Sequence, residues 1–208
     1  MSSSPNLIIL DLGGVLFNID FERTKRALLE LPGYNGLDVR FGVETQSDVF
    51  VDYDRGALTT SEFREKLRSM YGYVCSDEEI DRAWCAILDK GLFPFASDVV
   101  RSIRMRFASR PGDRLVIFSN ISELHYLDAK DRCQAVFTLV DKVYLSYTLG
   151  LRKPDPQSFL AICELEGIPA SHTLLIDDSI ANCTSAESLG ITTIHVTDPS
   201  AVITSYLS

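Results

Sequence analysis

The sequence lacks any apolar run long enough to cross a bilayer, since stretches such as residues 7–10 and 115–118 fall far short of the roughly 20 residues that a helix needs. Cysteine is sparse, with five scattered residues and no Cys-x-x-Cys pair. We therefore expect reduced thiols, and neither a disulfide framework nor a zinc site. The first residues show no basic region followed by an apolar one, so we expect no signal peptide and a cytoplasmic protein.

Positive charge is also in short supply. Lys and Arg total 20 against 29 Asp and Glu, which gives a formal net charge of −9. This balance argues against nucleic acid or anionic membranes as partners, and an anionic small molecule would need a metal ion or a few local cations. The three histidines show no paired spacing, so structural roles are expected for them. No heptad pattern or apolar face indicates an oligomeric state.

Length and composition favour an ordinary globular protein. The chain has 208 residues, of which 46% are hydrophobic and 24% charged, and this suits one domain or a domain with a modest insertion. Internal repeats and linkers rich in Gly, Ser or Pro are missing. Short apolar runs recur instead, each ending in polar residues, at 7–10, 115–118, 173–176 and 192–196. Such runs are typical of strands buried on both faces of a parallel sheet, and segment 142–148 is a weaker candidate strand.

Helical patterns separate these runs. Residues 97–109, 156–166 and 179–189 carry apolar side chains at helical spacing or are bounded by Pro and Gly where helices begin and end. Strand and helix thus alternate over residues 97–200. The alternation predicts an α/β fold, a three-layer, doubly wound and mainly parallel sheet.

Residues 18–90 break this alternation. Stretches 21–31, 61–70 and 77–88 read as helices with no buried strand between them. Two of them begin with capping boxes, Thr59-x-x-Glu62 and Ser76-x-x-Glu79. We therefore predict a helical insertion over 18–90, within a core formed by residues 1–17 and 91–208.

Polar residues gather where the predicted strands end, and these positions are the candidate site. The carboxyl ends of parallel strands form the ligand crevice of a doubly wound sheet. Three carboxylates packed together with a single lysine suggest a hard divalent cation such as Mg²⁺. Taken singly, each residue is equally explained as a helix cap, a turn residue or a solvated loop residue. The candidates are Asp11, Ser119, Asn120, Lys153, Asp177 and Asp178.

Four ordered motifs resemble those of the haloacid dehalogenase-like hydrolase superfamily, and an insertion after the first motif is similar to its helical cap. The motifs are residues 11–15 (Asp-Leu-Gly-Gly-Val), 119–120 (Ser-Asn), 153–154 (Lys-Pro) and 175–178 (Leu-Ile-Asp-Asp). Residues 18–23 (Asn-Ile-Asp-Phe-Glu-Arg) further resemble small-sugar-phosphate phosphatases of that family, including bacterial glucose-1-phosphate phosphatases. Each motif alone is weak, but the order and spacing of all four are specific.

The resemblance implies a Rossmann-like core and a Mg²⁺-dependent phosphatase of small phosphorylated metabolites, most of all sugar phosphates. Asp11 is expected to attack phosphorus and to form an aspartyl phosphate that water hydrolyses. Ser119, Asn120 and Lys153 are expected to bind the phosphoryl oxygens, with Ser119 and Lys153 also counted as catalytic.

The same resemblance implies a metal site and a specificity-setting cap. Mg²⁺ is expected to bind Asp11, the carbonyl of Gly13, Asp177 and Asp178, of which Asp178 is the stronger candidate. The cap is expected to close over the substrate. Its expected substrate-binding residues are Asp20 and Arg23, with Phe17, Tyr53 and Arg55 as further candidates nearby.

One position departs from the usual phosphatase pattern. Most relatives carry a second Asp two residues after the nucleophile as the general acid and base, whereas this chain has Gly13. General acid catalysis is worth about 10²–10⁴-fold, so its loss favours esters with acidic leaving groups, such as sugar 1-phosphates, acyl phosphates and aryl phosphates. Three alternatives stay open: a metal-independent haloacid dehalogenase-type hydrolase, a catalytically quiet phosphate-binding module and, less favoured, a phosphomutase.

Overall fold

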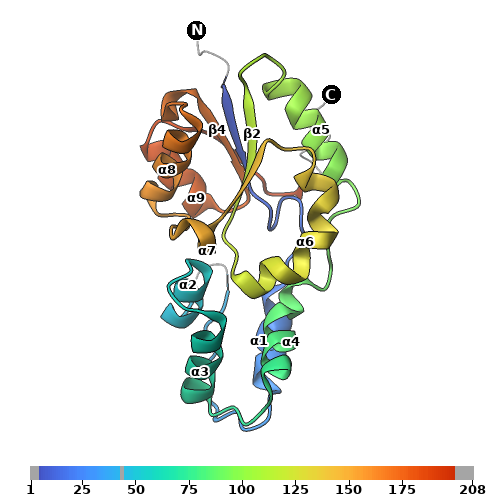
Figure 1. Cartoon of the computed structure of the whole chain (residues 1–208), viewed down its shortest axis with the longest axis vertical. Helices are drawn as coiled ribbons and strands as arrows, with labels where there is room; N and C mark the ends of the chain where they lie inside the picture. The colour runs from blue at the N-terminus through green and yellow to red at the C-terminus, as the bar shows by residue number, and fades with distance from the viewer. Residues whose placement is uncertain (1–4, 43–44, 200–208) are drawn as a thin grey trace.

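A five-stranded parallel sheet forms the centre of the computed structural model, which describes residues 5–42 and 45–199 (Figure 1). The strand order is β3-β2-β1-β4-β5, and each neighbouring pair is parallel. This order confirms the predicted doubly wound sheet. Residues 1–4, on which part of the signal-peptide expectation rests, lie outside the described residues. The strands are β1 (Leu7–Leu10), β2 (Arg114–Ser119), β3 (Lys142–Leu145), β4 (Thr173–Asp177) and β5 (Thr192–His195).

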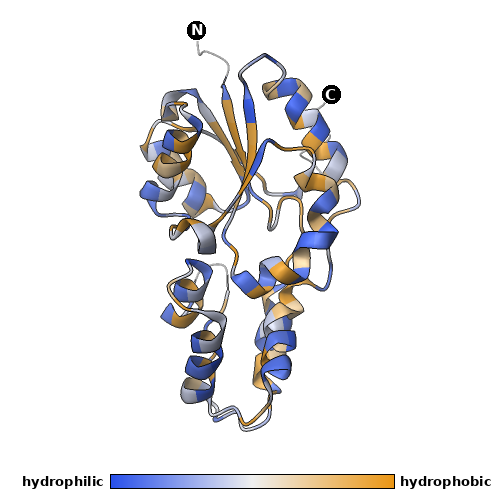
Figure 2. Ribbon diagram, viewed as in Figure 1, coloured by the Kyte–Doolittle hydropathy of each residue, from blue (hydrophilic) through white to orange (hydrophobic). Residues whose placement is uncertain are grey.

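Helices cover both faces of the sheet because alternate side chains of each strand point to opposite faces. On one face Ile8 and Leu10 of β1 share a core with α5 (Ala96–Phe107) and α6 (Glu123–Phe137). On the other face Leu7 and Ile9 pack with α8 (Pro156–Glu166) and α9 (Ile180–Ser188). The central strands β1, β2 and β4 are accordingly apolar over most of their length (Figure 2). The result is the expected three-layer arrangement.

The segment expected to be a helical insertion forms the lower part of the molecule in Figure 1. Its described residues, 18–42 and 45–90, contain helices and no strand longer than an isolated bridge. Both predicted capping boxes are present, with the Thr59 and Ser76 side chains each accepting from the backbone N–H of the glutamate three residues on. The elements are α1 (Phe21–Leu29), α2 (Asp48–Asp54), α3 (Thr60–Tyr71), α4 (Asp77–Cys85) and the 3-10 turn η1 (Ala86–Leu88).

Trp84 joins this helical region to the sheet domain. Its indole stacks on Phe50 (ring centroids 5.2 Å apart) and on His125 of α6 (4.5 Å). The indole N–H donates to Ser122 Oγ at 3.0 Å. One continuous apolar cluster runs from this region to a face of the sheet. The division into a core of residues 1–17 and 91–208 and a cap of 18–90 stays a prediction, and we use the word cap for residues 18–90.

The segment predicted as a weaker strand, 142–148, is a strand only as far as Leu145. The chain then turns into a short helix, α7 (Ser146–Leu149), which ends at Gly150 in the left-handed conformation. The turn buries the Ser146 hydroxyl, which accepts from the Ile121 backbone N–H at 2.9 Å and donates to the Asp54 carbonyl at 2.5 Å. These contacts hold the end of α2 against the core.

Among the described residues, the structure contains no helix of the length and hydrophobicity that a membrane span requires.

Candidate active site

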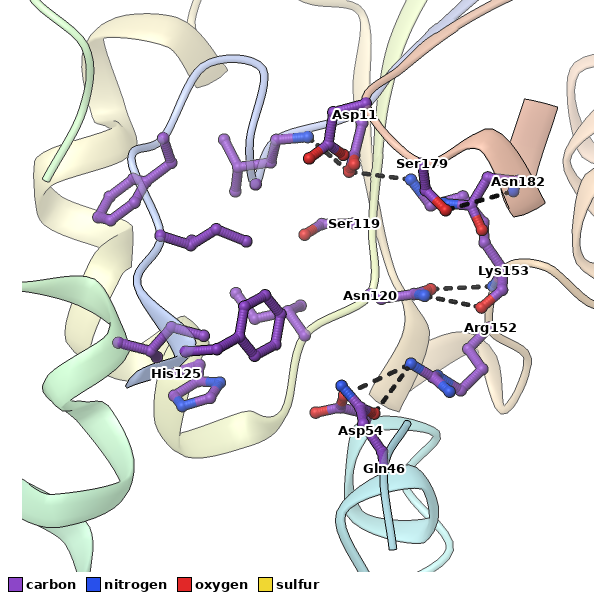
Figure 3. Close-up of a pocket in the computed structure, with 18 of the residues that line it drawn as sticks. Asp11, Gln46, Asp54, Ser119, Asn120, His125, Arg152, Lys153, Ser179 and Asn182 are labelled. Carbon is purple, nitrogen blue, oxygen red and sulfur yellow. Dashed lines mark hydrogen bonds and ion pairs between the residues drawn. The ribbon is translucent and has the colours of Figure 1, made fainter. Parts of the chain in front are cut away.

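The carboxyl ends of the central strands bring the predicted residues together. Asp11 directly follows β1, Ser119 ends β2 and Asp177 ends β4. One carboxylate oxygen from each of Asp11, Asp177 and Asp178 lies within 4.8 Å of the others. Asp11, Ser119 and Asn120 line the same pocket (Figure 3). Residues more than 160 positions apart in sequence therefore form one site, as the pattern of strand ends predicted.

Lys153 is the cation at the centre of this cluster, and its side chain is 1% exposed. Its Nζ lies 2.9 Å from Asp11 Oδ1 and 2.6 Å from Asp177 Oδ2. The side chain of Asn120 holds the lysine backbone at two points, accepting from its N–H at 2.9 Å and donating to its carbonyl at 2.8 Å. Asn120 thus positions the loop that carries the ammonium group.

The adjacent carboxylates Asp177 and Asp178 have different surroundings. Asp177 is fully buried, and it accepts from Lys153, from the Ser179 backbone N–H (2.9 Å) and from Asn182 Nδ2 (2.9 Å). These contacts make Asp177 an anchor for the lysine. Asp178 is less buried, and its side chain lies beside the backbone of Gly14. Ser179, and neither aspartate, is the N-cap of α9.

The cluster carries more negative than positive charge. Burial raises the pKa of Asp11 above its ordinary value, the charges of Asp177 and Asp178 add to the rise, and Lys153 opposes it. Burial likewise raises the pKa of Asp178, with Asp177 contributing and Lys153 again opposing. Both shifts report an environment in which a further cation would favour the ionised carboxylates.

Gly14 allows Asp178 to approach the loop after β1. It has a φ of +73°, and a Cβ added there would lie 2.0 Å from Asp178 Oδ2. We expect Gly14→Ala to cost about 1–2 kcal/mol of stability through backbone strain. We also expect it to displace Asp178 and to weaken the Mg²⁺-dependent activity that the sequence motifs imply at least about tenfold. Chemical unfolding and activity titrated with Mg²⁺ measure the two effects.

Gly167→Ala is the matched control, because Gly167 has a φ of +68° and, among the described residues beyond its own stretch of chain, no atom lies within 4 Å of an added Cβ. Gly167→Ala should lose stability through the same backbone strain and keep wild-type activity. Equal activity of the two variants would disprove the role given to Gly14.

A cavity of about 340 Å³ leads from Asp11 into the cap. Its near end carries the charged cluster and Ser119. Apolar side chains form much of its wall, and a second polar group, made of Gln46, Asp54 and Arg152, lies at the other end (Figure 3). The main apolar wall residues are Phe17, Ile19, Phe21, Phe41, Val51, Ile87 and Leu88.

The cap residues that sequence reasoning selected are only partly in this cavity. Phe17 lines it. Asp20 and Arg23 are not among its lining residues: Asp20 pairs with Lys90 (3.0 Å), and Arg23 pairs with Asp89 (2.9 Å). Their substrate-binding role stays a prediction, and these pairings give it no support.

Asp54, Arg152 and Gln46 are among the polar lining residues that the sequence did not reveal. Asp54 stands between the two selected positions Tyr53, which is buried against Phe63, and Arg55, which is exposed. Helical geometry places neighbours on different faces, and no sequence motif marked which of the three positions faces the cavity.

His125 also lines the cavity, and the structural role that its isolated spacing predicts stays a prediction. Its ring is stacked on Trp84, and Nε2 lies 3.0 Å from the Trp84 carbonyl oxygen. Burial lowers the pKa of His125 to about 4. The imidazole is therefore uncharged near neutral pH and adds no cation to the site.

Burial raises the pKa of Asp54 to about 6, while Arg152 opposes the rise. A carboxyl with a raised pKa binds its proton more tightly in the folded state, so its contribution to stability is present below about pH 4 and is lost as the pH rises to about 6. We expect the free energy of unfolding of the wild type, relative to that of Asp54→Asn, to fall by on the order of 2 kcal/mol across this window. Urea unfolding at several pH values measures it.

Asp52→Asn is the control for this titration, because Asp52 lies on the same helix and pairs with Arg55 at the surface. Its stability should follow the wild type at every pH. Parallel curves for the wild type and Asp54→Asn would show that Asp54 keeps an ordinary pKa.

Comparisons with known proteins agree with this geometry. The family model for haloacid dehalogenase-like hydrolases matches residues 5–190. A curated relative, the D-ribitol-5-phosphate phosphatase of Bacteroides thetaiotaomicron, is 28% identical over 195 residues, covering 89% of each chain. A phosphatase from Mycobacterium tuberculosis is 26% identical, covering 84% of this chain and 79% of its own.

A solved structure shares the whole fold. A haloacid dehalogenase (HAD) family enzyme from Bacteroides thetaiotaomicron, in complex with magnesium and inorganic phosphate, is 31% identical to this chain, with a TM-score of 0.75. The match covers 92% of this chain and 93% of that one. The sequence motifs, the sheet and its charged edge, and these matches together identify the chain as an enzyme that belongs to the haloacid dehalogenase-like hydrolase family.

Proposed function

We propose that this hydrolase is a Mg²⁺-dependent phosphatase of small phosphorylated metabolites, with sugar phosphates as the expected class, and that it works through an aspartyl phosphate on Asp11. The observation that carries the proposal is the buried Lys153 ammonium held between Asp11 and Asp177 at the end of an otherwise largely apolar cavity. Such a site offers a carboxylate nucleophile beside a fixed positive charge for an anionic group.

The donor set fits Mg²⁺. Three carboxylates supply closely spaced oxygens, one ammonium balances only part of their charge, and Mg²⁺ prefers one or two carboxylates with waters and phosphate oxygens. We assign the ion to Asp11, Asp178 and the carbonyl of Gly13, with Asp177 contributing chiefly by anchoring Lys153. Bound there, the ion would offset the charge of the carboxylates and of a phosphoryl oxygen. The haloacid dehalogenase-like relative that holds magnesium and inorganic phosphate supports Mg²⁺ as the ion.

The chain's own groups account for the transfer step. An Asp11 oxygen forms a bond to phosphorus while the ester P–O bond breaks, and the leaving alkoxide takes a proton from water because no side chain at position 13 supplies one. A water molecule then forms a bond to phosphorus, the bond between phosphorus and the Asp11 oxygen breaks, and phosphate leaves with the Asp11 carboxylate restored. The Lys153 ammonium, the Ser119 hydroxyl and the Asn120 backbone N–H stabilise the charge on the phosphoryl oxygens. The cap residues exclude bulk water from the cavity and select the leaving group.

Gly13 remains the departure from the usual pattern. A Cβ added at Gly13 would lie 3.2 Å from Ile19 Cδ1, so Ile19 occupies the space next to this position. The proton donor that many relatives carry there has no substitute at that position, which supports a preference for acidic leaving groups. The curated relative is named for D-ribitol 5-phosphate, which is an ester of a primary alcohol, and this argues against the preference.

The remaining predictions stand on the sequence. We propose a cytoplasmic enzyme whose partners are small phosphorylated molecules, without nucleic acid or membrane. The five cysteines are unpaired in the part of the chain that the structure describes, as reduced thiols would be.

The test is phosphate release from a panel of sugar 1-phosphates, D-ribitol 5-phosphate, acyl phosphates, nucleotides and an aryl phosphate, with Mg²⁺ and with a chelator. We expect turnover that the chelator abolishes and added Mg²⁺ restores. If no compound of the panel released phosphate, the proposed phosphatase activity would be disproved. Release of halide from 2-haloacids regardless of chelator would then favour the dehalogenase-type alternative, and phosphate binding without turnover would favour the quiet module.

A further inference from the structure

The end of the cavity opposite Asp11 holds a second charge pair, a buried Asp54 and a partly buried Arg152, that the proposed chemistry does not use. Asp54 comes from the end of α2 in the cap, and Arg152 comes from the core loop just before Lys153 (Figure 3). Gln46, in the segment before α2, completes the group, with its Oε1 3.3 Å from Arg152 Nη2. This polar group therefore exists only where cap and core meet.

The Asp54 carboxylate and the Arg152 guanidinium do not form a hydrogen bond with each other. The Asp54 side chain is 9% exposed, and its Oδ2 lies 3.9 Å from Arg152 Nη2, beyond hydrogen-bond distance. Among the described residues, Asp54 Oδ1 and Arg152 Nε are buried atoms without a hydrogen-bond partner. Buried charges in folded proteins are normally paired and hydrogen-bonded, so unmet donors and acceptors of this kind need an explanation.

A hydroxyl group is the ligand that meets this need. It donates one hydrogen bond, which a carboxylate oxygen accepts, and it accepts bonds from a guanidinium or amide N–H. An alkyl or prenyl chain at the same place would leave both charges unsatisfied. A second phosphate would place its charge beside the Asp54 carboxylate. The chemistry therefore points to a neutral, hydroxyl-bearing end of a substrate.

The cavity between the two polar ends suits the carbon skeleton of such a substrate. Phe17, Phe41 and Val51 line it, among other apolar side chains. Apolar walls pack against C–H groups, while a few placed polar groups set orientation and specificity. A phosphate ester bound with phosphate at Lys153 would direct the rest of its alcohol toward Asp54.

We propose that Asp54, Arg152 and Gln46 form a recognition subsite for hydroxyl groups at the far end of the alcohol part of the substrate, so that the enzyme selects phosphate esters of polyhydroxylated small molecules over alkyl phosphates of equal length. The subsite rests on the proposed phosphatase function, because it takes the phosphate to lie at Lys153. Asp54 acts in binding and positioning only.

The test compares D-ribitol 5-phosphate with n-pentyl phosphate, two esters of primary alcohols that have the same number of carbon atoms. Binding of each is measured by calorimetry with Mg²⁺ in an Asp11→Asn background, so that the result does not depend on turnover. The same titrations are made after adding Asp54→Leu, Asp54→Asn or, as the surface control, Asp52→Asn. Circular dichroism and thermal unfolding establish that each variant is folded, and the isosteric Asp54→Asn serves if Asp54→Leu is not.

We expect the parent to bind the ribitol ester at least about 100-fold more tightly than the pentyl ester, since sites built for hydroxyls reject analogues that lack them. Asp54→Leu should reduce this ratio to about tenfold or less by weakening only the ribitol ester, Asp54→Asn should reduce it partly, and Asp52→Asn should leave it unchanged. An undiminished ratio in folded Asp54 variants, tighter binding of the pentyl ester by the parent, or no binding of either ester would overturn the subsite.

The experiments distinguish failure of the proposed subsite from failure of the proposed phosphatase activity. Wild-type enzyme that hydrolyses both esters equally keeps the phosphatase and disproves the subsite. Selective binding of the ribitol ester without hydrolysis of any ester keeps the subsite and disproves the phosphatase. An Asp54→Leu variant that is less stable but equally selective would show that Asp54 and Arg152 only hold cap and core together.

Discussion

Asp11→Asn is expected to lower kcat by at least about 10⁴-fold with the best ester of the phosphate-release panel, while the protein stays folded. The amide keeps the shape of the carboxylate and its contact with the Leu12 backbone N–H, which Asp11 Oδ1 accepts at 2.7 Å, but it is too poor a nucleophile to attack phosphorus. Loss of a catalytic nucleophile costs factors of this size in other covalent hydrolases.

The thermal stability of Asp11→Asn, in contrast to its kcat, should stay the same or rise. Burial raises the pKa of Asp11, and Asp177 and Asp178 raise it further, so the folded protein holds the ionised carboxylate at a cost. Without added metal, a neutral amide removes that cost, and we expect Asp11→Asn to unfold at the same temperature as the wild type or higher. Asp98→Asn, at an exposed position paired with Arg101, is the control and should change neither activity nor stability. A folded Asp11→Asn variant that retains more than a few per cent of wild-type turnover would remove Asp11 as nucleophile.

Lys153→Met is expected to damage both folding and chemistry, because one ammonium group serves two buried carboxylates. Removing it leaves Asp11 and Asp177 without their shared counter-ion, and breaking a buried pair in this way costs about 3–5 kcal/mol. It also removes the fixed positive charge at the phosphoryl group, for which we expect a loss of about 10³-fold or more in kcat. Urea unfolding and steady-state kinetics measure the two effects.

Lys90→Met separates this effect from the general loss of a lysine. Lys90 pairs with Asp20 at 3.0 Å, but its side chain is 43% exposed, and exposed pairs contribute about 1 kcal/mol or less. We expect near wild-type stability and activity for Lys90→Met. If the two lysine variants behaved alike, the buried network would not have the energetic role assigned to it.

The sheet and its charged edge were predictable because local sequence carries their signal. Four-residue apolar runs such as 7–10 are buried on both faces in β1 and need no knowledge of distant residues. The position of Asp11 at the end of such a run predicts which edge of the sheet it occupies. Capping at Thr59 and Ser76 likewise depends only on the next three residues.

The far end of the cavity was not predictable, because contacts between distant segments create it. Helix α2 has only seven residues, and its end is held by the bond from Ser146 Oγ to the Asp54 carbonyl, 92 positions away. Arg152 meets Asp54 only once cap and core have packed. By contrast, Asp20 and Arg23, chosen for their place in a motif, lie on a helix start where Lys90 and Asp89 pair with them.

The central claim is that Asp11 carries the phosphoryl group during turnover, and mass spectrometry of the acid-quenched enzyme tests it most directly. Wild-type protein with Mg²⁺ is mixed with excess substrate, quenched during turnover and digested at low pH. We predict phosphate on the peptide that contains Asp11, decaying as substrate is exhausted and missing from Asp11→Asn. Phosphate on any other residue, or undiminished turnover by Asp11→Asn with no phosphorylated peptide, would contradict the account.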